Sequence, residues 1–222
     1  IGDGSWNGGS ATTLGTDLSG AITIPDTVDG YNVTSIGSQA FYNCPSLETI
    51  DLGNSVTSIG DYAFLSCTNL ISIDFSGTQV TTIGNTAFGS CSSLTSVHLG
   101  DSVTTIDTQA FYQCSSLTSI HIPDSVTTIG SSAFYQCSSL ISVTLPTNPL
   151  FTTIGDFAFY QCSKLTSIDL PNSLTSIGNG AFEYCSSLTS IIIPDSVTTI
   201  DRLVFYQCSS LTSIHIPDSV TT

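Results

Sequence analysis

The apolar positions of this chain recur in a unit of about 23 residues along almost its whole length. In one such unit, Leu117, Ile120 and Ile122 alternate with polar residues, which predicts a short strand with one buried face. Residues 123–125 then predict a turn, because proline fixes φ and aspartate can bond to its own backbone. One unit cannot bury its apolar side alone, so the units must stack to share a core.

The second half of the unit predicts the return path of the coil. Val126 and Ile129 flank two threonines and predict a second short extended segment. Gly130 permits a sharp reversal, and residues 131–136 predict about one helical or 3₁₀ turn that presents Phe134 to the core. The whole pattern predicts a repeat solenoid of about nine turns, built from short parallel strands and short helical or 3₁₀ turns.

Two columns of identical residues mark the period. A phenylalanine recurs once per unit, at Phe41, Phe64, Phe88, Phe111, Phe134, Phe159, Phe182 and Phe205. A cysteine does the same, at Cys44, Cys67, Cys91, Cys114, Cys137, Cys162, Cys185 and Cys208. A disulfide framework would not space its cysteines so evenly, which favours buried free thiols that each reach a backbone carbonyl. The two wider intervals arise where residues 76–79 and 146–150 lengthen the same turn.

The two ends depart from the unit. Residues 1–36 predict an N-terminal cap with a first atypical repeat, in which residues 6–10 are loop-like and residues 28–33 contain an inserted turn. Residues 37–222 carry the regular repeats, and the last repeat is truncated in mid-unit. We therefore expect the natural chain to continue with further repeats, or this uncapped end to be covered by another molecule, including a second copy.

The charge of the chain excludes several classes of partner. The net charge is −15, and Lys164 and Arg202 are the only lysine and arginine. Nucleic acids and anionic membranes are bound by clustered basic residues, so the sequence argues against both. It also contains no apolar stretch near the roughly 18 residues of a membrane-spanning helix. The acidity fits a cationic partner, a divalent ion or a glycan.

The recurring motif is Val-Thr-Thr-Ile-Gly-x-x-Ala-Phe-x-x-Cys-Ser-Ser-Leu-Thr-Ser-Ile-x-Ile-Pro, and from Ala21 onward it closely resembles the BspA-like, or Treponema pallidum-type, leucine-rich repeat. The resemblance implies a curved, right-handed leucine-rich-repeat coil. It also implies a secreted or cell-surface protein of bacteria or protists with a role in adhesion. The family shares no catalytic residues, so the resemblance does not imply an enzyme.

The strand position between the two inward isoleucines faces outward in every unit and forms a candidate interaction face. Its charged and imidazole-bearing members are Asp51, Asp74, His98, His121, Asp169 and His215. Asp74, His98 and His121 fall on successive turns, and two imidazoles with a carboxylate are plausible ligands for zinc or copper. The alternative is a solvated face on which polar residues vary, so these three residues remain metal candidates only.

A second outward column lies in the turn after the strand and carries carboxylates and amides. Its members are Asp26, Asn54, Asp101, Asp124, Asn172, Asp195 and Asp218. Calcium could bridge neighbouring carboxylates, although Asp and Asn are also the residues that such a turn prefers. No cofactor is assigned, and calcium stays an open alternative. Asn32 begins the sequon Asn32-Val33-Thr34 and is a glycosylation candidate.

These features together predict an extracellular or cell-surface structural or adhesive repeat protein that mediates protein–protein interaction or assembly. The expected partners are proteins or glycans at the cell surface or matrix. The alternative is a module that binds calcium, a transition metal or a glycan through the outward Asp and His columns. An enzyme is not expected, because all three histidines lie in the outward strand column, away from the serine or cysteine nucleophile that a triad requires.

Overall fold

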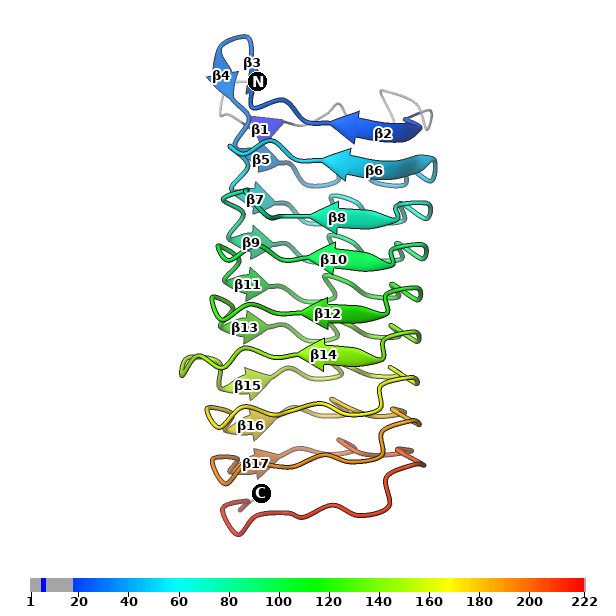
Figure 1. Ribbon diagram of the computed structural model, residues 1–222, viewed down its shortest axis with the longest axis vertical. Coiled ribbons are helices and arrows are strands. Elements are labelled where there is room, and N and C mark those ends of the chain that lie inside the picture. Colours follow the sequence, from blue (N-terminus) through cyan, green and yellow to red (C-terminus); the bar gives the residue numbers. More distant parts are fainter. Residues whose placement is uncertain (1–4, 7–17, 222) are drawn as a thin grey trace.

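The computed structural model describes residues 5–6 and 18–221 and shows a parallel β-solenoid. Followed from the N-terminus in Figure 1, the chain descends as a right-handed coil whose successive turns lie almost directly below one another. The full unit with its cysteine occurs eight times, so the number of complete turns is about eight rather than the predicted nine, because the first, atypical repeat lacks the full unit. The predicted solenoid of short parallel strands is confirmed.

One side of each of the first six coils contributes a strand to a sheet that we call the front sheet. Among the described residues it has six strands: β2 (Gly20–Thr23), β6 (Leu47–Asp51), β8 (Ser72–Asp74), β10 (Ser96–His98), β12 (Ser119–His121) and β14 (Ser142–Thr144). Equivalent residues of adjacent coils are in register, as the pairing of Ile120 with Val143 illustrates. Ile120 is buried while Ser119 and His121 are exposed, so the predicted alternation is confirmed.

The opposite side of each coil contributes to a longer back sheet. Its nine described strands are β1 (Ser5–Trp6), β5 (Ser35–Ile36), β7 (Ser58–Ile59), β9 (Thr82–Ile83), β11 (Thr105–Ile106), β13 (Thr128–Ile129), β15 (Thr153–Ile154), β16 (Ser176–Ile177) and β17 (Thr199–Ile200). A threonine precedes each strand from β5 onward and reinforces the stack, as where Thr104 donates through its hydroxyl to the carbonyl of Thr81 at 3.1 Å. Short strands therefore suffice, because each backbone is held by neighbours above and below.

The segment after the back strand differs from the prediction. Residues 131–136 and their equivalents form consecutive hydrogen-bonded turns, and no helix occurs within residues 5–6 and 18–221. Ser132 and Gln136 have φ near +58°, and a left-handed residue interrupts any helix. Alternate amides instead bond to the next coil, as between the Gln136 N–H and the Tyr160 carbonyl at 2.7 Å. The predicted helical turn was wrong because inter-coil bonds satisfy the backbone here.

The core is one continuous stack to which each coil contributes several apolar side chains. Phe88 and Phe111 lie with ring centroids 5.4 Å apart and planes 8° from parallel, and Phe111 and Phe134 repeat this geometry at 5.4 Å and 4°. All three rings are fully buried. At the end of the described stack, Phe205 is only partly buried because one side of its ring has no further coil. The phenylalanine column predicted as core is confirmed.

The N-terminal region contains the predicted inserted turn. Strands β3 (Thr27–Val28) and β4 (Tyr31–Asn32) form an antiparallel hairpin closed by Asp29 and Gly30, both of which have positive φ. Such an Asp-Gly pair is the favoured sequence of a two-residue hairpin turn. Trp6, expected in a loop, instead lies in β1 and pairs with β5. The remaining loop-like residues 7–10 lie outside the described part of the chain.

Candidate functional site

The outward column of the front sheet has the arrangement that the period predicts. Asp74 pairs in register with His98, and His98 pairs with His121, so the three side chains occupy equivalent positions on adjacent strands. All three are exposed on a sheet whose opposite face is buried. The front sheet therefore presents an imidazole pair beside a carboxylate on a rigid, regularly spaced surface.

Local contacts favour the ionised form of Asp74. Partial burial raises its pKa, but hydrogen bonds from the side chain and backbone of Ser76 and the nearby His98 outweigh burial and hold the pKa below its ordinary value. The Ser76 N–H lies 2.7 Å from the Asp74 Oδ1. One carboxylate oxygen is thus already engaged by the turn that follows the strand.

The same column does not assemble a ready metal centre. Within residues 5–6 and 18–221, no group of three or more His, Cys, Asp or Glu side chains is placed so that it could hold a metal ion. Asp74, His98 and His121 share a column, but successive strands separate them by about 4.8 Å each, so side chains two strands apart do not converge. They remain candidates for metal binding by sequence pattern rather than by geometry.

The front sheet ends at β14, although the back sheet continues through β15, β16 and β17. Below Thr144, only a bridge between Ser167 and Ser190 is formed on this side of the described chain. A cleft of about 480 Å³ lies at this break, between residues 143–147 of one coil and residues 169–173 of the next. Asp169 therefore lines a cleft.

The last members of the column lie outside the paired sheet. Ile192 and His215 are exposed in segments without an assigned strand, and Ile192 is 84 % exposed. Of the predicted interaction face, the structure thus brings Asp51, Asp74, His98 and His121 together on one sheet. Asp169 and His215 follow beyond the break in that sheet.

The break coincides with the lengthened turn at residues 146–150. This turn is held to the coil before it, because Asp124 accepts hydrogen bonds from the backbone and side chain of Thr147 at 2.6 and 3.0 Å. These two bonds, with a smaller contribution from His121, lower the pKa of Asp124 despite slight desolvation. Asn148 adds bonds to the carbonyls of Asp124 and Val126 at 2.7 and 2.8 Å. Asp124, a member of the turn column that could be a calcium ligand by sequence, therefore anchors the lengthened turn.

The cysteines form the buried ladder that their spacing predicts. All eight are free and buried. From the second onward, each thiol donates to the carbonyl oxygen of the core phenylalanine one coil before, at 3.1 to 3.3 Å. Burial raises the pKa of Cys67 and of Cys137 to about 12. These thiols are inert structural groups rather than nucleophiles.

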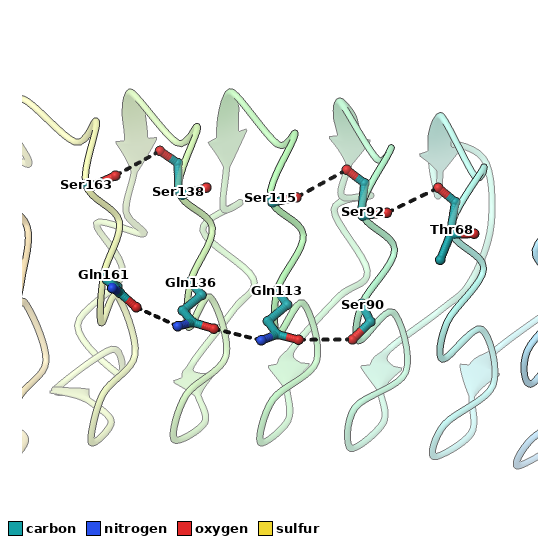
Figure 2. A pocket seen from close by; sticks show the side chains of 9 residues that line it. All are labelled: Thr68, Ser90, Ser92, Gln113, Ser115, Gln136, Ser138, Gln161 and Ser163. Carbon is teal, nitrogen blue, oxygen red and sulfur yellow. Dashed lines mark hydrogen bonds between the residues drawn. The ribbon is translucent and has the colours of Figure 1, made fainter.

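A polar groove runs along the coil edge that carries the cysteine turn, and sequence reasoning missed it. Figure 2 shows two rows of side chains on either side of this groove, which has a volume of about 560 Å³. Its lining residues are Thr68, Ser90, Ser92, Gln113, Ser115, Gln136, Ser138, Gln161 and Ser163. The recurring Gln two residues after the core Phe was the available signal.

The glutamine row of the groove is a continuous amide ladder. Gln113 donates through Nε2 to the Oε1 of Gln136 at 2.7 Å, and Gln136 donates in the same way to Gln161 at 2.5 Å. Ser90 begins the row by donating to Gln113 at 3.3 Å. The row stops where Tyr184 occupies the equivalent position. The side chains are therefore fixed by one another in a single orientation.

A tyrosine ladder precedes the glutamine row by one residue. Tyr112 stacks on Tyr135 with centroids 5.1 Å apart, and Tyr135 stacks on Tyr160 at 4.4 Å. Burial and the neighbouring Tyr135 and Glu183 raise the pKa of the Tyr160 hydroxyl. These half-buried rings pack on one another between coils.

The glycosylation candidate is accessible. Asn32 lies in β4 of the hairpin and is exposed, and its neighbour Tyr31 is 68 % exposed. An oligosaccharide at this position would meet solvent rather than the core. The structure therefore leaves Asn32 accessible to modification.

The fold and its surfaces define a leucine-rich-repeat protein of the binding-scaffold class. The model of the BspA-type leucine-rich repeat region matches residues 20–118 and 104–222 in six copies. The chain belongs to the BspA-type leucine-rich repeat family. The predicted family is therefore confirmed. Repeat proteins of this class are typically non-enzymatic binding scaffolds.

Within residues 5–6 and 18–221, the chain forms no apolar helix of the length that a lipid bilayer requires.

Solved structures of bacterial leucine-rich-repeat proteins agree with this assignment. A Bacteroides ovatus protein is 33 % identical with a TM-score of 0.80, covering 90 % of this chain and 52 % of its own. The T. pallidum leucine-rich repeat protein is 32 % identical with a TM-score of 0.64, and the match covers 89 % of this chain and 79 % of that protein. A leucine-rich cell surface protein of Faecalibacterium prausnitzii is 32 % identical with a TM-score of 0.55, and the match covers 88 % of this chain and 59 % of that protein.

The chain thus spans about half the length of the Bacteroides ovatus protein, at 52 % of it. Among curated proteins, none matches significantly.

Proposed function

We propose that this chain is an extracellular adhesive scaffold that binds a protein partner through the outward column of its front sheet. The observation that carries the proposal is the in-register row of Asp74, His98 and His121 on a sheet fixed by its neighbours. Leucine-rich-repeat scaffolds bind through such extended surfaces. The family membership and the F. prausnitzii neighbour, which is described as a cell surface protein, support the location.

The chemistry of the column suits a basic protein surface. Asp51 and Asp74 are exposed and the net charge of the chain is −15, so the field of the molecule attracts positive partners and repels acidic ones. Rigid strands limit the entropy that the scaffold loses on binding. The histidines add hydrogen-bond donors and acceptors beside the carboxylates.

Binding of purified extracellular matrix proteins tests the proposal. We would measure their affinity by biolayer interferometry for the chain and for the double variant Asp51→Asn with Asp74→Asn. The matched control changes two exposed carboxylates of the turn column, with Asp101→Asn and Asp195→Asn. A loss of about tenfold or more in affinity, confined to the first variant, supports the front sheet. Equal affinity of both variants contradicts it.

Location is tested separately. Antibodies against the chain should label intact cells of the source organism as strongly as permeabilised cells. Labelling that appears only after permeabilisation contradicts an extracellular role, whatever the binding experiment shows.

A further inference from the structure

The groove in Figure 2 is chemically uniform. Its nine lining residues are serine, threonine and glutamine, and none of them is charged. The lining spans five coils, from Thr68 to Ser163, which corresponds to roughly 20 Å at about 4.8 Å per coil. The groove is therefore long and neutral, on a molecule that is otherwise strongly acidic.

The groove keeps unused hydrogen-bonding capacity at every coil. A glutamine amide has two N–H donors and an oxygen with two lone pairs. The ladder uses one N–H each of Gln113 and Gln136, and its acceptors take one bond each. The opposite row supplies serine hydroxyls, of which Ser115 and Ser163 make only long contacts of 3.5 and 3.3 Å to the coil before. Each coil thus offers both donors and acceptors to a ligand.

The groove is also held in shape before any ligand arrives. Gln113, Gln136 and Gln161 all have φ of 57–58°, so the turn fixes where each side chain leaves the backbone. The amide ladder then fixes the side-chain orientation. A ligand would not have to order these groups, and binding would not lose that entropy.

We propose that this groove binds an extended, uncharged polysaccharide along the solenoid axis. The hydroxyl groups of such a chain donate and accept, which matches the hydroxyls that line all five coils and the amides that line three of them. A pyranose ring is similar in length to the rise of one coil, so a linear chain can repeat its contacts along the groove. The occupied surface differs from the front sheet, and this inference does not depend on the protein partner proposed above.

The lining disfavours the two other classes of extended ligand. A peptide groove needs apolar pockets for alternate side chains, and the nine lining residues include no aliphatic or aromatic side chain. An anionic polymer such as an acidic glycan or a nucleic acid needs basic residues, and none lines the groove. Of the extended ligands considered, an uncharged polymer rich in hydroxyl groups is the one that fits this lining.

The test is affinity electrophoresis of the folded chain in native gels that contain one polymer each. The neutral probes are hydroxyethyl cellulose, laminarin and mannan, and the comparison probes are heparin and a fluorescent glutamine-rich peptide measured by polarisation. The groove variant is Ser115→Ala with Ser138→Ala, which removes two hydroxyls and leaves the backbone turns intact. The matched control, Ser119→Ala with Ser142→Ala, removes the same groups from the same coils on the front sheet.

At least one neutral polysaccharide should retard the chain, and the groove variant should weaken that binding about fivefold or more while the control leaves it unchanged. Gln136→Glu should weaken it further, because the substitution keeps the side-chain size but replaces the amide donors with a charged acceptor and breaks the bond to Gln161. Circular dichroism melts of each variant identify any loss due to unfolding. Retardation by no neutral polysaccharide, binding of heparin or the peptide alone, or equal weakening by groove and control variants would overturn the proposal.

Discussion

The thiol of Cys114 donates to the carbonyl oxygen of Phe88 at 3.2 Å, across the boundary between two successive coils. The same carbonyl also accepts the N–H of Cys91 within its own coil at 3.3 Å. One backbone oxygen therefore satisfies a turn bond and an inter-coil bond at once. Repetition of this relationship makes the cysteine column a structural seam of the solenoid.

We expect the cysteines to be unreactive in the folded chain. Burial removes access and raises the thiol pKa values, so little thiolate is available to react. Ellman's reagent at pH 8 should react negligibly with the native protein. In guanidinium chloride it should react with all eight thiols. The first thiol to react on partial unfolding should be Cys208, which lies in the last full unit and is 8 % exposed. If the native protein reacts fast with Ellman's reagent, and the Cys208→Ser variant still does so, the thiols are not protected by burial as we expect.

The same column should make the protein sensitive to alkali. A thiol whose folded pKa is about 12, against 9.0 for the ordinary group, keeps its proton in the folded state while the unfolded state loses it. The folded state then binds more protons, so the free energy of unfolding falls as pH rises between about 9 and 12. Each such thiol contributes a slope of about 1.4 kcal/mol per pH unit in that window.

Urea melts at pH 8, 9, 10 and 11 measure this slope. The variant Cys137→Ala should show a shallower fall than the parent above pH 9, although it is less stable at pH 8. A slope unchanged by the substitution would mean that another group controls the alkaline transition.

The phenylalanine stack should carry much of the stability. Phe111 is fully buried between Phe88 and Phe134, and Phe111→Ala should lower the free energy of unfolding by about 3–5 kcal/mol. Phe205→Ala, at the partly buried end of the stack, is the matched control and should have a clearly smaller effect. Chemical denaturation of both variants measures the difference. Equal losses would show that the stack does not act as a continuous core.

Much of this fold follows from sequence because each position repeats. The spacing of Ile120, His121 and Ile122 predicts both the buried face and the exposed column of a strand, and the structure shows both. The constant cysteine interval likewise predicts a column of buried thiols. A rule that holds in one coil holds in the next, so a short pattern specifies most of the molecule.

The parts that sequence reasoning missed depend on conformations that propensities do not report. Gln136 adopts a left-handed conformation because its N–H bonds to the next coil, and that choice replaces the expected helical turn. The groove follows from the same residue, since its side chain meets those of Gln113 and Gln161 only once the turns are stacked. The break below Thr144 coincides with the lengthened turn, whose bond to Asp124 of the previous coil appears only once the coils are stacked.

We expect metal ions to leave the melting temperature unchanged. His98 and His121 supply two imidazoles in register, but the described residues provide no third ligand that converges on them. A ligand that binds only the folded state raises the midpoint, so the readout is direct. Differential scanning fluorimetry with EDTA, calcium and zinc measures it. A rise with zinc that His98→Gln abolishes would establish the predicted metal candidates as a real site.

The loop that interrupts the front sheet should depend on Asn148. Its side chain donates to the carbonyls of Asp124 and Val126 and accepts from the N–H groups of Leu150 and Phe151 at 2.8 and 3.1 Å. Asn148→Ala removes all of these bonds and should lower the free energy of unfolding by about 1–3 kcal/mol.

The substitution should also free the loop tip, where Leu150 is 71 % exposed. We therefore expect limited proteolysis with a protease that cleaves after leucine to cut Asn148→Ala at Leu150 before the rest of the coil. The parent should resist cleavage at this bond. Asn54→Ala, in the turn of an uninterrupted coil, serves as the control and should change neither stability nor cleavage. Rapid cleavage of the parent at Leu150 would show that the hydrogen bonds of Asn148 do not fix the loop.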